Sequence, residues 1–106
     1  MADPTMHDYM TVSRVAWGPL MFEAARCARD MGVLEALKAG PMTPTEVSEK
    51  AKVSYYAARV LLEACLSLDL LELHDRNYRL SGSGFVLLHD PEVRVNMDFT
   101  HDVCYQ

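Results

Sequence analysis

The segment from residue 43 to residue 80 constrains the fold most, because it orders a short helix, a turn, a longer helix and a hairpin. Thr43, Pro44 and Glu46 supply an N-cap hydroxyl, a proline at the first helical position and a carboxylate at the third, which is the pattern of a capping box. We expect that helix to end near Ala51, and Ser54 to cap the longer helix that follows. The longer helix carries one apolar stripe, made of Ala57, Val60, Leu61, Ala64 and Leu68.

A β-hairpin is predicted directly after the longer helix. Residues 71–73 and residues 78–80 both alternate apolar and polar side chains, and the polar run from His74 to Asn77 separates them. A helix, a turn, a second helix and a hairpin in this order make a winged helix-turn-helix. The predicted fold class is therefore mainly α: a winged helix-turn-helix with extra N-terminal helices and a small β-hairpin wing.

The remaining segments are also predicted to be helical. Val33 to Ala39 is expected to form a short amphipathic helix, and Phe85 to Leu88 a short apolar one. Residues 92–99 alternate as a strand would, but Asp90 and Pro91 suit an N-cap and a first helical position, and we choose the helix. A chain of 106 residues is the size of one domain. We divide it into N-terminal helices at 5–40, the winged unit at 43–80 and a C-terminal helical segment at 81–106.

Two N-terminal helices have more apolar surface than a small domain can cover. The first runs from about Thr5 to Trp17, and the second starts at Pro19 and stops at Gly32. An ordinary surface helix has an apolar stripe a little over 100° wide, and both of these are wider. We therefore expect an interface with a second copy of the chain, with the core of a small helical domain as the alternative. The expected interface residues are Tyr9, Met10, Trp17, Leu20, Met21, Phe22, Ala24 and Ala28.

The charge distribution argues against nucleic acid as a partner. The whole chain has a formal charge of −5, and the winged unit holds five basic residues against six acidic ones, a net charge of −1. Arg59 is the only cation on the helix that would enter the major groove, and Glu63 lies one turn further on, where it can pair with Arg59. DNA-binding proteins typically make about 6–10 phosphate contacts. A winged-helix transcription regulator that binds DNA is therefore the alternative function rather than the first.

The sequence contains no complete catalytic, cofactor-binding or metal site. It has no glycine-rich phosphate loop, and its cysteines at 27, 65 and 104 form no C-x-x-C pair. The residues that could do chemistry together are Asp98, His101, Asp102 and Cys104, since a helix would put Asp98 and His101 on one face. Such residues near a chain end are more often a solvated polar face. No apolar run approaches the ~20 residues of a membrane span, and no signal peptide is recognised, so we expect a cytoplasmic protein.

Four segments resemble the N-terminal region of small-molecule O-methyltransferases. Ala28 to Leu37 resembles the helix pair that opens these enzymes, and Pro44 to Ser48 resembles the element that follows it. Arg59 to Leu71 is similar to their next helix, and Tyr78 to Ser81, with Gly84 after it, is similar to the segment behind the wing. Residues 62–71 are closest to the acetylserotonin (hydroxyindole) branch. Each motif is weak alone, but their order and spacing over residues 8–105 are fairly specific.

The resemblance implies the N-terminal homodimerisation domain of an S-adenosylmethionine-dependent O-methyltransferase that acts on a small hydroxylated, aromatic molecule. In that family a Rossmann-like domain follows, which binds S-adenosylmethionine and holds the catalytic base. That domain is missing here, so this chain alone is expected to be inactive, with 81–106 leading toward it. The family's first helices also reach toward the partner's substrate pocket, a role that transfers loosely to Tyr9, Trp17, Met21 and Phe22. A free-standing regulator related to the family remains open.

Overall fold

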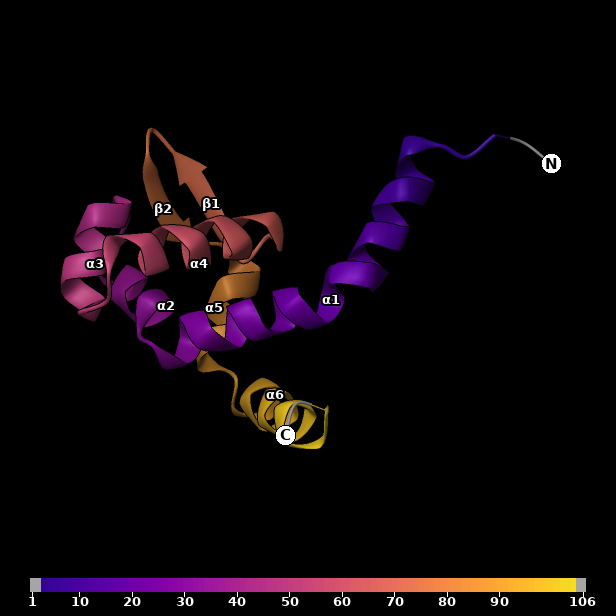
Figure 1. The fold of residues 1–106 in the computed structure, drawn as a ribbon. Coiled ribbons are helices and arrows are strands. Elements are labelled where there is room, and N and C mark those ends of the chain that lie inside the picture. The colour runs from indigo at the N-terminus through magenta and orange to yellow at the C-terminus, as the bar shows by residue number, and fades with distance from the viewer. Residues whose placement is uncertain (1–2, 105–106) are drawn as a thin grey trace.

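The computed structural model describes the backbone of residues 3–104 (Figure 1). The order of elements along the chain is helix, short helix, 3-10 turn, two further helices, hairpin and two final helices. Their bounds are α1 Met6–Asp30, α2 Val33–Ala36, η1 Leu37–Ala39, α3 Pro44–Ala51, α4 Tyr55–Ser67, β1 Leu71–His74, β2 Asn77–Leu80, α5 Gly82–His89 and α6 Pro91–Cys104. The molecule is mainly helical with a winged helix-turn-helix at its centre, as the sequence predicts.

The predicted caps of the winged unit are confirmed. The hydroxyl of Thr43 accepts the backbone N–H of Glu46 at 3.3 Å, and the Glu46 carboxylate accepts the N–H of Thr43 at 3.0 Å. The hydrogen bond from the Thr43 backbone lowers the pKa of the Glu46 carboxyl. At the next helix, the hydroxyl of Ser54 accepts the N–H of Ala57 at 3.0 Å. Both helices of the unit therefore begin where the local sequence provides a partner for their first free N–H groups.

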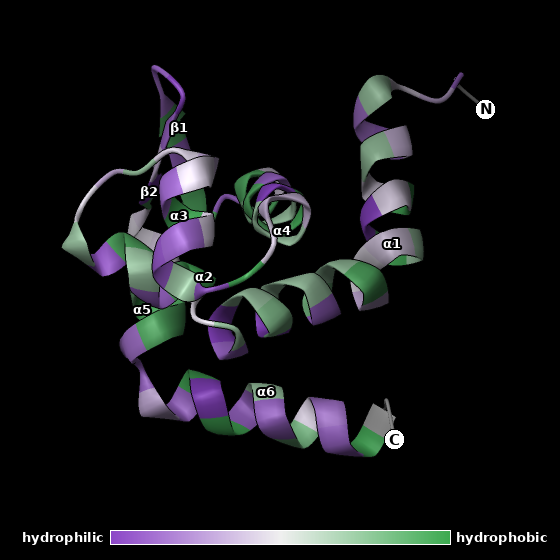
Figure 2. Cartoon of the chain, turned by 60° about the vertical axis from the view of Figure 1, so that its left-hand side comes forward, coloured by the Kyte–Doolittle hydropathy of each residue, from purple (hydrophilic) through white to green (hydrophobic). Residues whose placement is uncertain are grey.

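The predicted hairpin is confirmed as β1 and β2. Leu71 pairs with Leu80 at one end and His74 with Asn77 at the other. Asp75 and Arg76 between them have φ values of 49° and 69°, and two left-handed residues in a two-residue loop give the twist that suits a tight hairpin. The wing is thus a short antiparallel pair whose exposed tip is polar (Figure 2).

The core lies where α4 packs between the second half of α1, α2, α3 and the hairpin. Its largest fully buried side chains are Leu34, Leu62, Val33, Val47 and Cys65. Burial in this apolar setting raises the pKa of the Cys65 thiol to about 12, so the thiol stays protonated near neutrality. Tyr78 of the wing is also buried and lies in the same cluster.

Two glycines shape the connections around this core. Gly32 has a φ of 83°, a left-handed conformation that suits glycine, and it turns the chain from α1 into α2. Gly84 lies at the start of α5, where an added Cβ would stand 2.0 Å from the carbonyl oxygen of Leu70. The closeness of α5 to the end of α4 therefore depends on the missing side chain of Gly84.

The N-terminal helices differ from the prediction. Residues 5–17 and 19–31 were expected as two helices with a start at Pro19, whereas α1 is one helix of 25 residues with Pro19 inside it. Proline lacks the N–H that would bond to the carbonyl of Val15, and its ring crowds that carbonyl. Such a residue bends a helix instead of ending it when the flanking turns are held, and α1 bends near its middle (Figure 1).

The C-terminal segment is helical as predicted, and α6 extends over residues 91–104 in place of a strand at 92–99. Below the body, α6 runs beside the second half of α1, and the first half of α1 projects away from both (Figures 1 and 2). The radius of gyration is 14.9 Å, against about 13 Å for a compact domain of 100 residues. The projecting half of α1 accounts for the excess.

Candidate functional site

The projecting part of α1, which we call the arm, spans residues 6–17. Every residue of the arm is exposed, including its large apolar side chains. Val15 is 77% exposed and Trp17 is 60% exposed. An isolated helix shorter than about 12–15 residues is marginally stable in water. The arm therefore has neither the length nor the packing that would keep it helical by itself.

Most apolar side chains of the arm lie on one side of α1. Met6, Met10, Ser13 and Trp17 follow one another at spacings of three and four residues, which places them on one face. Tyr9 and Ala16 flank this row, and Leu20 continues it at 60% exposure. Contiguous exposed apolar surface of this kind marks interaction sites in soluble proteins.

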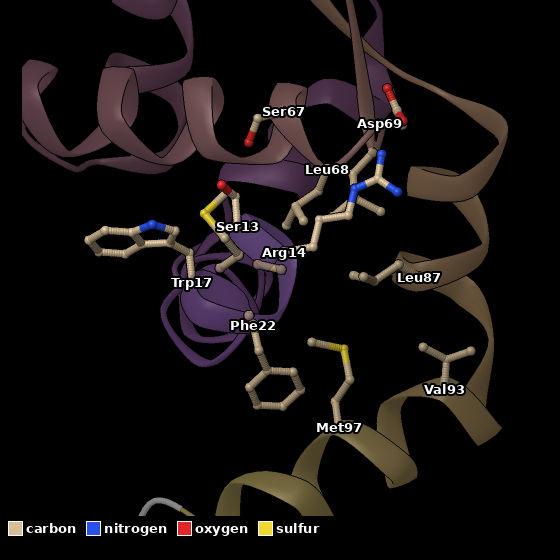
Figure 3. A pocket seen from close by; sticks show the side chains of 14 residues that line it. Ser13, Arg14, Trp17, Phe22, Ser67, Leu68, Asp69, Leu87, Val93 and Met97 are labelled. Carbon is tan, nitrogen blue, oxygen red and sulfur yellow. The ribbon is translucent and has the colours of Figure 1, made fainter. Parts of the chain in front are cut away.

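A hollow of about 810 Å³ opens where the arm joins the body. It lies between α1, the end of α4, α5 and α6 (Figure 3). Its walls are mostly apolar. We call it the hollow, and its lining consists of Ser13, Arg14, Trp17, Gly18, Met21, Phe22, Ala25, Ser67, Leu68, Asp69, Leu70, Leu87, Val93 and Met97.

Two charged side chains stand on the rim of the hollow. Arg14 extends from α1 into the space beside Leu68 and Leu87 in the view of Figure 3. Asp69 follows α4 in a left-handed conformation with a φ of 61°, and its backbone carbonyl accepts the hydroxyl of Ser81 at 2.7 Å. The hollow is thus an apolar space with one cation and one anion at its edge.

Two polar contacts fasten α6 to α1. The Arg29 guanidinium, 6% exposed, donates to the Asp98 carboxylate at 2.7 Å. The His101 ring lies 2.8 Å from the Glu23 carboxylate. The hydrogen bond from Arg29 lowers the pKa of the Asp98 carboxyl. The lower wall of the hollow therefore depends on these contacts, because Val93 and Met97 belong to α6.

These contacts engage two of the four residues that could have done chemistry together at 98–104. Asp98 and His101 both face α1, while Asp102 is exposed. The side chain of Cys104 lies outside the described residues. Among the residues that the structure describes, no three His, Cys, Asp or Glu side chains come together as a metal site would require.

The expected interface residues fall into three groups. Tyr9, Met10, Trp17 and Leu20 are well exposed, whereas Met21, Phe22 and Ala24 are half-buried where α1 meets the body. Ala28 is fully buried in the core of its own chain, so its inclusion was wrong. Helical spacing cannot tell a residue that faces the chain's own core from one that faces a partner.

The hollow was not foreseen from the sequence. Leu68, Leu87, Val93 and Met97 come from different parts of the chain and converge only in the folded molecule. Within its own segment, each of these residues is an apolar side chain like its neighbours. No local pattern marks them as the walls of one space.

On the face that would bind DNA, the cation of α4 and one cation of the wing are already paired with carboxylates. On α4, the Arg59 guanidinium donates to Glu63 at 3.2 Å, which raises the pKa of Arg59. On the wing, Arg79 donates to Glu72 at 3.0 Å. Tyr55 and Tyr56 are exposed at the start of α4. The geometry gives no support to the DNA-binding alternative.

A family model places the chain among known domains. The model of the Dimerisation2-like domain matches residues 10–78, well over half of the sequence. The chain belongs to the Dimerisation2-like domain family. The match begins within the arm and ends in β2, so it includes the part of the exposed apolar face from Met10 onward, α4 and most of the hairpin. No curated protein sequence matches the chain.

Solved structures agree with this family. Human N-acetylserotonin methyltransferase in complex with SAM is 24% identical, with a TM-score of 0.70, over 86% of this chain and 28% of its own. The mitomycin 7-O-methyltransferase MmcR is 27% identical, with a TM-score of 0.71, over 87% and 28%. A pericyclic reaction enzyme is 22% identical, with a TM-score of 0.77, over 93% and 26%. This Dimerisation2-like domain thus spans less than a third of the length of each of these proteins.

Within the described residues, no helix is both long enough and apolar enough to cross a bilayer. Even α1, with 25 residues, carries charged side chains along its length.

Proposed function

We propose that this Dimerisation2-like domain is the homodimerisation domain of an S-adenosylmethionine-dependent O-methyltransferase, and that it is not catalytic by itself. The observation that carries the proposal is the fully exposed arm, with its one-sided apolar face, in a member of this family. The methyl acceptor in the proposal is a small hydroxylated, aromatic molecule. The parent enzyme would bind S-adenosylmethionine in a domain outside these 106 residues.

The energetics of the arm favour a partner. Removing apolar surface from water contributes about 25 cal/mol for each Å², and the arm exposes Met6, Tyr9, Met10, Val12, Val15 and Trp17. Because an uncovered arm is only marginally helical, a partner would both bury this surface and hold the helix. A second copy of the chain supplies such a partner with closed symmetry.

In this proposal the interface is centred on Tyr9, Met10, Trp17 and Leu20. Met21, Phe22 and Ala24 form its edge, where α1 enters the body. The proposed organisation keeps residues 5–40 as the dimerising helices, 43–80 as the winged unit and 81–106 as the segment that leads toward the catalytic domain. Tyr9, Trp17, Met21 and Phe22 are the positions closest to a partner's acceptor pocket. The proposed location is the cytoplasm.

Several observations support methyl transfer over another reaction. The resemblance of the four sequence segments is to O-methyltransferases, and two of the three structural relatives described above are methyltransferases by name. The pericyclic reaction enzyme shares the fold as well. A fold alone does not set a reaction, so the acceptor and the reaction are tested on the longer parent protein.

The dimer itself is tested by sedimentation equilibrium over a range of micromolar concentrations. We expect the wild-type chain to be a dimer and the Trp17→Glu variant to be a monomer, because a carboxylate would be buried in the centre of the interface. The matched control is Tyr56→Glu, on the exposed side of α4 and outside the arm. It should leave the dimer unchanged.

Two results would refute this proposal. One is a wild-type chain that stays monomeric throughout the range. The other is equal weakening by Trp17→Glu and Tyr56→Glu, which would move the interface away from the arm. Circular dichroism on each variant confirms that the body remains helical.

A further inference from the structure

We propose that a second concave surface, formed by η1, β2 and α5, binds a small aromatic carboxylate. Arg79 and Lys38 hold the carboxylate, and the paired rings of α5 support the flat apolar part of the ligand. We call this surface the groove, and its volume is about 370 Å³. Its lining residues belong neither to the arm nor to the hollow. The inference therefore goes beyond the proposed homodimer and does not rest on it.

The walls of the groove are fixed by the backbone. On one side, Met42 directly follows Pro41 of the groove and exchanges two hydrogen bonds with Tyr78 of β2. The Met42 N–H donates to the Tyr78 carbonyl at 3.0 Å, and the Tyr78 N–H donates to the Met42 carbonyl at 2.7 Å. On the other side, α5 begins at the Ser81 hydroxyl, which accepts the N–H of Gly84 at 3.1 Å. Because these walls are already in place, a ligand that enters the groove has little of the protein to order.

The two permanently charged side chains that line the groove are both cations, Lys38 and Arg79. Their carboxylate partners lie outside the lining: Lys38 Nζ is 3.2 Å from Glu35 Oε1, and Arg79 Nε is 3.0 Å from Glu72 Oε1. All four side chains are at least 43% exposed, and ion pairs between exposed side chains contribute little to stability. A carboxylate in the groove can therefore share or replace these partners at little cost.

Arg79 keeps N–H groups with which it can bind a ligand. A guanidinium has five N–H donors, and among the contacts of the described residues Arg79 donates only through Nε, to Glu72. The two oxygens of a carboxylate match the paired donors of a guanidinium. Glu72 and Arg79 are opposite each other in the wing, so their side chains share one face and Glu72 positions the guanidinium beside the groove.

The rings of Phe85 and His89 form an aromatic ledge on α5. Their centroids are 4.0 Å apart and their planes are inclined by 30°. His89 Nδ1 lies 2.9 Å from the carbonyl oxygen of Phe85, and since a carbonyl only accepts, this nitrogen carries the hydrogen and the bond orients the ring. The Phe85 residue is 56% exposed, so a flat ring can pack against it. Leu37 and Leu80 add further apolar surface to the groove.

The size of the groove favours a ligand with a single ring. Ligand pockets have volumes of about 300–1,000 Å³, and the groove, at about 370 Å³, is near the lower end. One aromatic ring with a carboxylate on a short stem reaches both the ledge and the cations. A molecule of about ten non-hydrogen atoms is expected to bind with a dissociation constant in the millimolar range.

The test is a titration of the 106-residue chain with phenylacetate, at constant ionic strength and up to about 20 mM ligand. Amide chemical shifts in NMR report the binding site and the dissociation constant. We expect the largest shifts at the amides of Lys38, Gly40, Arg79 and Phe85. Phenylacetamide has the ring without the charge, and acetate has the charge without the ring. Each should bind at least tenfold more weakly than phenylacetate.

Arg79→Gln should reduce the affinity for phenylacetate at least tenfold, to the level of phenylacetamide. The matched control is Arg59→Gln, which changes the net charge equally. Arg59 has the same side-chain exposure of 57% and donates through Nε to Glu63 at 3.2 Å, but it does not line the groove. This control should bind phenylacetate as the wild type does.

Phe85→Ala tests the ledge and should weaken phenylacetate binding at least fivefold. Its control is Phe99→Ala, which also removes an exposed ring but lies outside the groove. Circular dichroism checks that each variant is folded. If Phe85→Ala did not fold, Arg79→Gln would still decide the proposal, because it replaces an exposed side chain on the outer face of the wing.

Four results would overturn the proposal. The first is the absence of shifts at the groove amides throughout the titration, and the second is a set of shifts centred on the hollow instead. The third is equal binding of phenylacetate and phenylacetamide, which would leave the two cations without a role. The fourth is an equal loss in Arg79→Gln and Arg59→Gln, which would indicate general attraction of an anion. The oligomeric state enters none of these readings, so the groove and the homodimer can fail separately.

Discussion

The arm and the body contain the same kinds of residues but lie in opposite environments. Within α1 alone, Trp17 is 60% exposed and Ala28 is 0% exposed, although both lie on apolar faces of one continuous helix. Even the helix starts match: Thr5 and Asp8 form a capping box at the arm, as Thr43 and Glu46 do in the body. The difference shows that local signals specify a helix, whereas burial depends on what the rest of the chain, or a partner, brings against it.

The largest difference in stability between the two regions is expected when a glycine is replaced by alanine in each of them. Gly84→Ala in the body would place a Cβ 2.0 Å from the Leu70 carbonyl oxygen, and we expect a loss of about 3 kcal/mol or more of unfolding free energy. Gly18→Ala, beside the arm, meets nothing within 4 Å apart from its own chain neighbours. Its better helix propensity is opposed by crowding against the ring of Pro19, so we expect the unfolding free energy to change by less than about 1 kcal/mol. Urea unfolding at concentrations where the chain is monomeric measures both.

If Gly84→Ala and Gly18→Ala changed the unfolding free energy equally, the contrast between the body and the arm would not hold. A mild Gly84→Ala would mean that α5 can move away from Leu70. A loss as large as that of Gly84→Ala in the Gly18→Ala variant would mean that this part of α1 is packed even in the monomer.

An intermediate difference in stability is expected when the N-cap threonine of each capping box is replaced by alanine. Thr43→Ala removes an N-cap of the body, and we expect a loss of about 1 kcal/mol of global stability. Thr5→Ala removes the corresponding hydroxyl of the arm, which accepts the N–H of Asp8 at 3.2 Å, but should leave the monomer's unfolding midpoint unchanged and lower only its helical circular dichroism. Thr45→Ala, exposed in α3, is the control. A shifted midpoint for Thr5→Ala would show that the arm unfolds together with the body.

The smallest effect is expected at the junction of α6 and α1. The pKa of Asp98 is lowered from 3.8 by the hydrogen bond from Arg29. The ionised carboxylate therefore stabilises the fold above the ordinary pKa, and this contribution is lost as the pH falls through the lowered pKa. Asp98→Asn should reduce the amide protection of residues 93–103 at neutral pH, without unfolding the body.

The control for this junction is Asp102→Asn, an exposed neighbour on α6. It should leave the protection of α6 unchanged. If the amides of α6 were as well protected in the Asp98→Asn variant as in the wild type, apolar contacts through Met97 and Val93 would be holding the helix. The wall of the hollow would then be independent of the charge on Asp98.

The parts of the fold that sequence predicted are those with a local cause. The capping box at Thr43, the hairpin and the helix end at Gly32 each depend on a few neighbouring residues, and all three are present. The capping box of Thr5 and Asp8 was not predicted, although it has an equally local cause. The prediction that a new helix starts at Pro19 was wrong. A proline is compatible with both a helix start and a bend inside a helix, and the packing of the flanking turns decides which of the two forms. The hollow could not be foreseen, since Leu68 and Met97 meet only through tertiary structure.

The exposure of the arm beyond the bend at Pro19 also has a consequence for how the protein is made. The arm precedes the body in the chain, so it leaves the ribosome first, yet among residues 3–104 it remains exposed after the body has folded. The body can fold through contacts within its own chain, whereas in the proposed homodimer the arm is covered only after an encounter whose rate depends on concentration. Newly synthesised copies would therefore pass through an interval in which proteases and chaperones compete with the second subunit for the same apolar helix.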